Sequence, residues 1–437
     1  MSGEREAVAI IGAGPAGCMC AYFASKNADV ILFDYAQPLH TLLYTGGGRC
    51  NLAYAQYDFK ELAKNYPRGE KFLYSVFSQF STSNAIEFFE KIGVKTYTQQ
   101  DSRIFPISNS AKEVKEKMLK SIKNCTIKKE KVIKIKPLTL PSPYGTPHPN
   151  PLPQGERESN YNKIFSPRGE GKEKSKFLIT TDKNNYSFDK VVIATGGHAG
   201  FDLAQSLGHK IIKPKPSLVG LISNENFSSL KGLSLKNIKA QVFFNDRLIT
   251  KENEDILFTH QGVSGPLIYK ISSLCARLDY NRQNPLKIKL EFIPEDFDLQ
   301  IALNSNVKKN IKNLLCEFVP KSMAEYILGL NNIKVDDKCS QINSQKRDLI
   351  KKSLSEFEIN AISPTKEGEI VTSGGICLDE INSKTMESKL TQGLYFCGEV
   401  INVDGFCGGF NLQNCWSTGF VAGSSVTNSR AGWQSRQ

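Results

Sequence analysis

The chain has 437 residues, of which 40% are hydrophobic and 23% charged, and its formal net charge at pH 7 is +12. This composition is typical of globular proteins and excludes wholesale disorder, collagen and coiled coil, while ~150 residues per domain predicts two or three domains. No apolar run reaches the ~18 residues that cross a bilayer, and none has the form of a signal-peptide core, so we expect a cytoplasmic protein without a membrane partner.

The chain starts with a strand–turn–helix–strand pattern. Residues 7–11 (AVAII) form a short apolar run and lead into the glycine-rich GAGPAG at 12–17. Residues 18–27 are compatible with a helix, and residues 29–33 form a second apolar run that ends at Asp34. This order predicts a βαβ unit of the kind that binds dinucleotides.

The residue types in this unit suit a dinucleotide. Gly12 permits a tight turn, Gly14 lets the backbone approach a pyrophosphate, and Gly17 allows close packing of helix on strand. The helix N-terminus offers unpaired N–H groups and the positive end of a dipole. Asp34 is placed to accept hydrogen bonds from an unphosphorylated ribose, which favours FAD or NAD over NADP.

A proline-rich stretch interrupts the chain at residues 137–176. It holds eight of the 19 prolines and has neither the strand period nor the helix period. The flanking residues 126–136 and 177–181 alternate like strands, so we expect a disordered insertion at the tip of a hairpin. The alternative is a polyproline segment that docks on a partner.

Further glycine-rich patches recur along the chain. They are TGGGRCN at 45–51, KVVIATGG at 190–197, GLYFCGE at 393–399 and VDGFCGGFNLQ at 403–413, the last followed by an apolar helical segment at 415–422. One nucleotide fold rarely needs glycine at so many strand ends. A long prosthetic group lying across the carboxyl edge of a sheet does need it, which favours FAD over NAD.

In the middle of the chain the periodicity changes from strand to helix. Strand-like segments, with a turn signal at 245–247, occupy 218–223, 238–244, 248–250, 256–260 and 286–292. Helical spacing predominates from 295 to 357, with candidate helices at 307–318, 321–328 and 345–357, the last capped by Ser344. The strand pattern returns at residues 358–363.

Eight motifs together carry a family resemblance. GAGPAG, TGGGRCN, DSRIFP, ATGG, LFTHQGVSGP, VTSGGI, TMESK and GLYFCGEVINVDGFCGGFNLQ occur in that order. The chain, except residues 137–176, resembles the BaiN/YhiN-type FAD-dependent flavoproteins, distant relatives of fumarate-reductase-like flavoproteins. The resemblance implies an α/β fold in which a Rossmann-like FAD-binding domain is split by an inserted domain. We place the two parts of the FAD domain at 1–212 and 358–437, and the insert at 213–357, with a β-barrel (213–294) and a helical part (295–357).

The resemblance also implies which residues contact FAD. In matched motifs these are Gly12, Gly14, Ala16, Gly17, Asp34, Gly47, Gly48, Arg49, Cys50, Asn51, Val132, Thr195, Gly196, Gly398, Glu399, Asp404, Gly408, Gly409, Phe410, Asn411 and Leu412. The fingerprint meets the pyrophosphate, Val132 meets adenine through its backbone, and Glu399 and Asp404 meet the ribityl chain. The segment 408–412 presents a helix N-terminus to the isoalloxazine ring, whose reduced form gains negative charge that such a terminus stabilises.

The chain departs from the family pattern in three places, and the first two are expected to alter the substrate pocket more than FAD binding. The stretch at 40–44 (HTLLY) lacks the basic residue usual before the glycine motif. The loop after ATGG is short, since 198–201 leads almost at once to an expected helix at 202–207. The third departure is the insertion at 137–176.

Two residues are candidates for catalysis. His260, in THQGVSGP, is either a proton donor reaching over the flavin or a structural residue of a Gly/Pro-dictated turn. Arg49 binds either an anionic substrate or the flavin diphosphate, and the diphosphate is preferred. Cys50 has no CxxxxC partner, so thiol redox chemistry is not expected, and His209 is interpreted as a polar helix cap.

The eleven cysteines are odd in number and include no CxxC pair, so neither a disulfide framework nor a metal site is expected. The leading hypothesis is an FAD-dependent oxidoreductase that transfers hydride through flavin N5, between NADH or NADPH and a small substrate such as a carbonyl-conjugated C=C bond. No second GxGxxG follows a strand, so a dedicated nicotinamide domain is not expected.

Two alternatives stay open. The excess positive charge suggests an RNA-binding or tRNA-modifying flavoprotein, although no basic run with interleaved aromatic residues supports a nucleic-acid partner. The altered loops and the insertion suggest a degenerate FAD-binding protein with little turnover.

Overall fold

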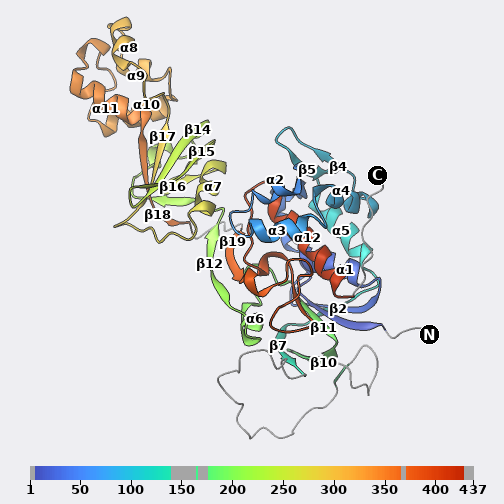
Figure 1. Ribbon diagram of the computed structural model, residues 1–437. Helices are drawn as coiled ribbons and strands as arrows, with labels where there is room; N and C mark the ends of the chain where they lie inside the picture. Colours follow the sequence, from blue (N-terminus) through green and yellow to red (C-terminus); the bar gives the residue numbers. More distant parts are fainter. Residues whose placement is uncertain (1–4, 139–163, 166–175, 366–370, 428–437) are drawn as a thin grey trace. The chain divides into compact units, whose positions relative to one another are not determined.

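A computed structural model describes residues 5–138, 164–165, 176–365 and 371–427 (Figure 1). The chain divides into two compact units, one formed by residues 1–214 and 372–437 and the other by residues 215–371. The second unit is therefore inserted into the sequence of the first. Most of the proline-rich stretch, for which disorder is expected, lies outside the described residues.

The first unit is built on a parallel sheet with strand order β20-β11-β1-β2-β6. Its strands are β1 (Glu6–Ile11), β2 (Ala28–Asp34), β6 (Thr126–Lys129), β11 (Lys190–Ile193) and β20 (Leu394–Phe396). β1 and β11 are buried along nearly their whole length, which explains why their sequences are continuously apolar rather than alternating. The expected βαβ unit forms the centre of this Rossmann-like sheet.

Two helices of the first unit pack unusually closely. They are α1 (Pro15–Ala24), which joins β1 to β2, and α12 (Phe410–Ser425) near the C-terminus. A Cβ atom at Gly419 or Gly423 of α12 would lie 2.5 Å or 2.4 Å from a backbone carbonyl oxygen of α1. The glycines therefore let the backbones of the two helices touch, and the C-terminal segment completes the domain that the N-terminal segment starts.

Smaller elements surround the main sheet. The helices are α2 (Phe59–Ala63), α3 (Glu70–Phe77), α4 (Thr82–Lys91), α5 (Ala111–Ser121) and α6 (Phe201–Ser206), with 3-10 turns η1 (Thr41–Gly48), η4 (Leu378–Glu380) and η5 (Gly398–Val400). A three-stranded sheet contains β3 (Ala53–Tyr54), β5 (Arg103–Pro106) and β4 (Thr96–Thr98). β12 (Ile211–Ser217) pairs with β19 (Val371–Ile376).

A four-stranded sheet carries the flanks of the proline-rich stretch. Its order is β7 (Val132–Pro137), β9 (Phe177–Thr181), β10 (Asn185–Phe188) and β8 (Ile164–Phe165). Pro137 pairs with Phe177, and the Leu138 N–H donates to the Lys176 carbonyl at 2.7 Å, so the chain leaves and re-enters at one hairpin. The short strand β8, from within the stretch, pairs with β10 in parallel.

The second unit is a closed barrel with attached helices (Figure 1). The barrel strands are β13 (Leu221–Ser223), β16 (Gly262–Ser264), β15 (Arg247–Phe258), β14 (Ser234–Phe244), β17 (Leu286–Glu291) and β18 (Phe357–Pro364). The other elements are η2 (Ser228–Leu230), α7 (Pro266–Leu274), α8 (Leu299–Ser305), α9 (Ile311–Leu315), α10 (Lys321–Leu330), η3 (Cys339–Gln341) and α11 (Ser344–Ser355). The expected fold class, a Rossmann-like domain split by a barrel with a helical part, is confirmed.

Some boundaries differ from the expectation. The strand expected at 358–363 in the returning half of the FAD domain is β18, a barrel strand, because Phe357, Ile359 and Ala361 are buried in the barrel core. The segments 248–250 and 256–260 belong largely to one long strand, β15.

Two helix expectations are also corrected. The helix expected at 307–318 is reduced to α9, because Asn310 has an extended backbone (φ −67°, ψ 140°) and caps it. The cap of α11 is Asn343, not Ser344, since the Asn343 side chain accepts the Lys346 N–H at 2.9 Å.

Candidate functional site

The site starts at the turn between β1 and α1. Gly12 has φ 103° and its N–H donates to the Phe33 carbonyl of β2 at 2.8 Å. At the end of β2, the Asp34 carboxylate accepts the N–H groups of Ala13 (2.7 Å) and Ala36 (2.8 Å). Asp34 therefore ties the glycine turn to β2 while staying partly exposed, and its remaining lone pairs are available to a ribose.

The glycines of this turn differ in whether packing would leave room for a side chain. A Cβ at Gly12 would lie 2.4 Å from the Ala194 carbonyl oxygen, and one at Gly17 would lie 1.9 Å from the Gly12 carbonyl oxygen. A Cβ at Gly14 would meet nothing within 4 Å, and Gly14 has φ −76°, which any residue adopts. Packing thus explains Gly12 and Gly17, whereas Gly14 leaves open space at the N-terminus of α1, where a diphosphate would fit.

The ends of β11 and β20 bring two more glycine patches to the same edge of the sheet, because the carboxyl ends of parallel strands lie together. After β11, the Thr195 hydroxyl donates to the Ala199 carbonyl at 2.6 Å and closes the short loop before α6. After β20, the Gly398 N–H donates to the Thr418 hydroxyl of α12 at 2.9 Å, and a Cβ at Gly398 would lie 2.6 Å from the Ala16 Cβ.

The backbone of the TGGGRCN loop is left-handed at four residues. Gly46, Gly47 and Gly48 all have positive φ (58°, 67° and 84°), and Cys50 also has φ 64°. The Cys50 thiol is buried, and burial raises its pKa to about 12, so it is protonated at neutral pH. This state gives no support to thiol chemistry at Cys50.

Two side chains of this loop lie next to other elements of the unit: Arg49 is next to β5, and Asn51 is next to the start of α12. The Arg49 guanidinium carbon lies 4.2 Å from the centre of the Phe105 ring, and its Nε donates to the Gly46 carbonyl at 3.3 Å. Asn51 is buried, and its Oδ1 has no partner among the described residues. A Cβ at Gly409, the residue before α12, would lie 2.8 Å from that Oδ1.

The C-terminal motif shapes the approach to α12. The Asn411 side-chain amide closes a loop by donating to the Gly405 carbonyl (2.9 Å) and accepting the Gly405 N–H (2.8 Å). The Tyr66 hydroxyl donates to the Phe410 carbonyl at 2.6 Å. Gly408 (φ 139°) and Gly409 (φ 97°) let the chain turn directly into the helix.

A buried charge pair lies in the same motif. Asp404 is fully buried and forms a two-point ion pair with Arg68, a residue that precedes α3 and belongs to none of the sequence motifs. Burial of Glu399, together with the charge of Asp404, raises the Glu399 pKa to about 7. Sequence reasoning missed Arg68 because its partner lies 336 positions away.

The remaining expected residues are dispersed. Val132 opens β7 and is 9% exposed. His260 belongs to the second unit, where it is exposed in the turn between β15 and β16. His209 is not a helix cap by its side chain: the buried ring lies between the Glu380 carboxylate (3.0 Å) and the Ser388 hydroxyl (2.9 Å). Burial lowers the His209 pKa.

The residues present fit an FAD molecule. Open space beside Gly14, Gly47 and Gly196 lies along three of the glycine loops. Buried polar atoms without partners in the described part of the chain include Asn51 Oδ1, Gln413 Oε1 and both amide atoms of Asn414, so α12 carries hydrogen-bonding capacity that protein groups leave unused. Thr195, Gly398, Glu399 and residues 408–412 remain predicted cofactor contacts.

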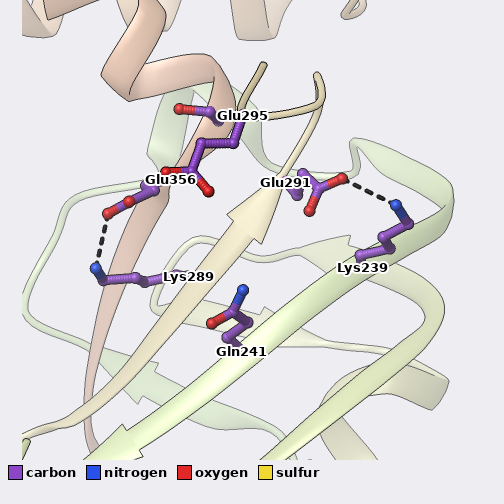
Figure 2. A pocket seen from close by; sticks show the side chains of 7 residues that line it. Lys239, Gln241, Lys289, Glu291, Glu295 and Glu356 are labelled. Carbon is purple, nitrogen blue, oxygen red and sulfur yellow. Dashed lines mark hydrogen bonds and ion pairs between the residues drawn. The ribbon is translucent and has the colours of Figure 1, made fainter. Parts of the chain in front are cut away.

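A small cavity in the second unit is a poor candidate for a substrate site. It has a volume of about 70 Å³, and Figure 2 shows its charged lining. Lys239 pairs with Glu291 at 3.0 Å, and Lys289 pairs with Glu356 at 2.7 Å (Figure 2). Its volume is far below the ~300 Å³ of a typical ligand pocket, and its lysines are already paired.

Within the described ranges, no helix is long and apolar enough to cross a membrane, and no three His, Cys, Asp or Glu side chains form a metal-binding group.

Comparisons with known proteins cover nearly the whole chain. The HI0933-like protein Rossmann domain family matches residues 6–140 and 160–425, so the match resumes within the proline-rich stretch. The chain is 26% identical to the 3-dehydro-bile acid delta(4,6)-reductase of Clostridium scindens, over 96% of this chain and 98% of that protein. It is 25% identical to the ribosomal RNA dihydrouridine synthase of Escherichia coli, over 97% and 98%.

Among solved structures, the chain is similar to the open conformation of a flavocytochrome c3 fumarate reductase, with TM-score 0.47 and 15% identity over 98% of this chain and 79% of that one. It is also similar to the 3-ketosteroid delta1-dehydrogenase of Sterolibacterium denitrificans, with TM-score 0.48 and 11% identity over 97% and 99%.

Proposed function

The chain belongs to the HI0933-like Rossmann family of FAD-binding flavoprotein oxidoreductases, and from this premise we propose that it is a reductase of C=C bonds conjugated to a carbonyl group. The family confirms the resemblance to BaiN/YhiN-type flavoproteins. NADH or NADPH is the proposed electron donor.

The observation that carries this proposal is the shared chemistry of two relatives. One is named for a delta(4,6)-reductase acting on a 3-dehydro-bile acid, and the other for a synthase of dihydrouridine. Both names describe saturation of a C=C bond that is conjugated to a carbonyl group. A reduction of this kind adds one hydride and one proton across the C=C bond, and the hydride brings the two electrons from a reduced carrier.

The chain's own residues would supply binding, charge stabilisation and a proton. FAD, when bound, supplies the two-electron carrier. Gly14 and the N-terminus of α1 would hold its diphosphate, and the N-terminus of α12 would stabilise negative charge. His260 is the proposed proton donor, with a purely structural turn as its alternative.

The test begins with purified protein. It is expected to be yellow, to release FAD on denaturation, and to bleach anaerobically with NADH or NADPH. Reoxidation by cyclic enones would support the reductase. A colourless protein that takes up no added FAD would contradict the proposal, and bleaching without reoxidation by any enone would favour the degenerate flavoprotein.

A second candidate is reduction of uridine within RNA, favoured by one surface feature. Residues 112–136 hold ten lysines and three glutamates, a net charge of +7. They span α5, β6 and β7, and in the described part of the chain only Lys112 among the ten has a carboxylate partner, Glu116 at 4.0 Å. Such a lysine-rich surface suits phosphate contacts.

The RNA candidate has its own test. Bulk ribosomal RNA should bind with an affinity that falls steeply with salt, and replacing Lys115, Lys120 and Lys123 by Glu should weaken it. The same triple variant should reduce small enones like the wild type. Equal RNA binding by both proteins would contradict this candidate.

A further inference from the structure

Arg49 stands out because its position is fixed while its charge is not neutralised. The three left-handed glycines before it and the left-handed Cys50 after it constrain the backbone. A Cβ at Gly46 would lie 2.8 Å from the Asn51 nitrogen and 2.9 Å from the Phe105 ring, so the loop is folded tightly onto β5. Arg49 therefore occupies a defined place and not a free loop tip.

The guanidinium is oriented by an aromatic ring. It lies 4.2 Å from the centre of Phe105 and uses Nε to donate to the Gly46 carbonyl. Among the described residues no carboxylate pairs with Arg49, and no group accepts a hydrogen bond from its two terminal nitrogens. A stacked guanidinium keeps those in-plane donors together as a fork that matches a carboxylate or a phosphate.

A neighbouring arginine provides the contrast. The Arg103 guanidinium carbon lies 6.0 Å from the centre of the same Phe105 ring. Unlike Arg49, Arg103 is engaged by Asp101, whose Oδ2 accepts from Arg103 Nε at 2.8 Å and also pairs with a terminal nitrogen. One guanidinium at this ring is therefore neutralised within the chain, and the other is not.

The contacts of this loop distinguish the two roles that the sequence leaves open for Arg49. Arg49 packs on β5, and the buried Oδ1 of Asn51, which has no partner in the described ranges, lies by the N-terminus of α12. The expected diphosphate position is at the N-terminus of α1, beside Gly14 and Asp34. The loop thus belongs with α12, where the reacting end of the cofactor and the substrate are expected.

We propose that Arg49 is the anion-recognition residue of the substrate site and that the physiological substrate carries a carboxylate or phosphate group. This inference rests on the proposed reductase function, because it assigns the loop beside α12 to the substrate. The positive end of the α12 dipole adds to the same preference for an anion. Arg49 contributes two parallel hydrogen bonds and places the substrate before reaction.

The experiment measures binding to the oxidised holoenzyme, so it requires no turnover. Each probe is an enone with and without its anion: a 3-oxo-4-ene steroid carboxylic acid against its methyl ester, and uridine 5′-monophosphate against uridine. Changes in flavin absorbance report the dissociation constant. The variants are Arg49→Met and Arg49→Lys, and the matched control is Arg103→Met, which removes the guanidinium that Asp101 already neutralises.

In the wild type and in Arg103→Met, one anionic probe should bind about tenfold or more tightly than its neutral partner, and the pair that shows this identifies a carboxylate or a phosphate source. Arg49→Met should abolish the preference and keep its FAD, and Arg49→Lys should retain part of it because it keeps the charge without the fork.

Three outcomes would overturn the inference. They are a preference that survives Arg49→Met, a wild-type protein that binds neither anion better than its neutral partner at millimolar concentration, and loss of FAD from Arg49→Met with the preference intact in the remaining holoenzyme. The last would assign Arg49 to the diphosphate. A protein that binds the anionic probes through Arg49 but reduces no enone would contradict the reductase and leave the anion site standing.

Discussion

Replacing Gly14 by serine should separate the needs of the fold from those of the cofactor. Gly14 is the N-cap of α1, has φ −76° and ψ −174°, and would place a Cβ in open space. Serine is a better N-cap than glycine by a few tenths of a kcal/mol, and loss of glycine freedom in the unfolded chain adds about 0.4–1 kcal/mol. The apoprotein should therefore gain about 1 kcal/mol, or about 2–4 °C in Tm.

FAD binding should change in the opposite direction. The serine side chain would fill the space next to the first N–H groups of α1 and compete for them, so FAD should bind about tenfold more weakly, a loss of about 1.4 kcal/mol. Thermal unfolding of the apoprotein gives the first quantity, and quenching of FAD fluorescence on titration gives the second.

The control for this prediction is Gly17→Ser. Its Cβ would lie 1.9 Å from the Gly12 carbonyl oxygen, so the apoprotein should lose about 3 kcal/mol or more before any cofactor is added. If Gly14→Ser destabilised the apoprotein as Gly17→Ser does, packing would explain both glycines. If it left the FAD dissociation constant unchanged, the pyrophosphate would not lie at Gly14.

Three further predictions concern charge and the proline-rich stretch. Because the pKa of Glu399 is raised from 4.5 to about 7, the folded state keeps a proton that the unfolded chain loses, and stability should fall as pH rises through this window. Glu399→Gln should therefore raise the urea midpoint more near pH 8 than near pH 5; an equal gain at both pH values would refute this. Arg68→Met leaves Asp404 buried without its guanidinium and should cost about 3–5 kcal/mol, while adding Asp404→Asn should restore part of the loss in the same urea assay; identical midpoints for the single and double variants would contradict the pairing. Deleting residues 141–159, which fall outside the family match and between paired hairpin strands, should leave FAD affinity and Tm unchanged, and loss of FAD would show that the stretch contributes to the site.

The local parts of the cofactor site could be predicted from the sequence. The βαβ unit requires an apolar strand, a turn with φ 103° at Gly12 and a helix that approaches the strand at Gly17, and each demand acts on residues close in the chain. The closely spaced glycines in the later patches likewise meet backbone requirements that act on residues close in the chain. Parallel strands also bring these loops together at one sheet edge, which is a general property of the fold and needs no side-chain detail.

Pairing between distant segments could not be predicted in the same way. β18 has the alternation of any half-buried strand, and only its partners β13 and β17 decide that it closes the barrel and does not return to the first domain. Likewise, Arg68 has no motif around it, and His209 has the sequence context of a helix end. Their pairing with Asp404 and Glu380 depends on contacts across 336 and 171 positions.

The residue pattern was therefore enough to indicate the cofactor class, because the site for a dinucleotide follows from local backbone requirements that glycine and apolar runs express directly. The expectation of a split domain came from the family resemblance and not from these local requirements. Which charges are neutralised depends on contacts that form only in the folded chain. Arg49 and Arg103 are indistinguishable as residue types, yet Asp101 engages one of them and leaves the other as the candidate for an anionic substrate. A charged side chain is available to a ligand only where no partner in the protein neutralises it, and folding sets both its partners and its burial.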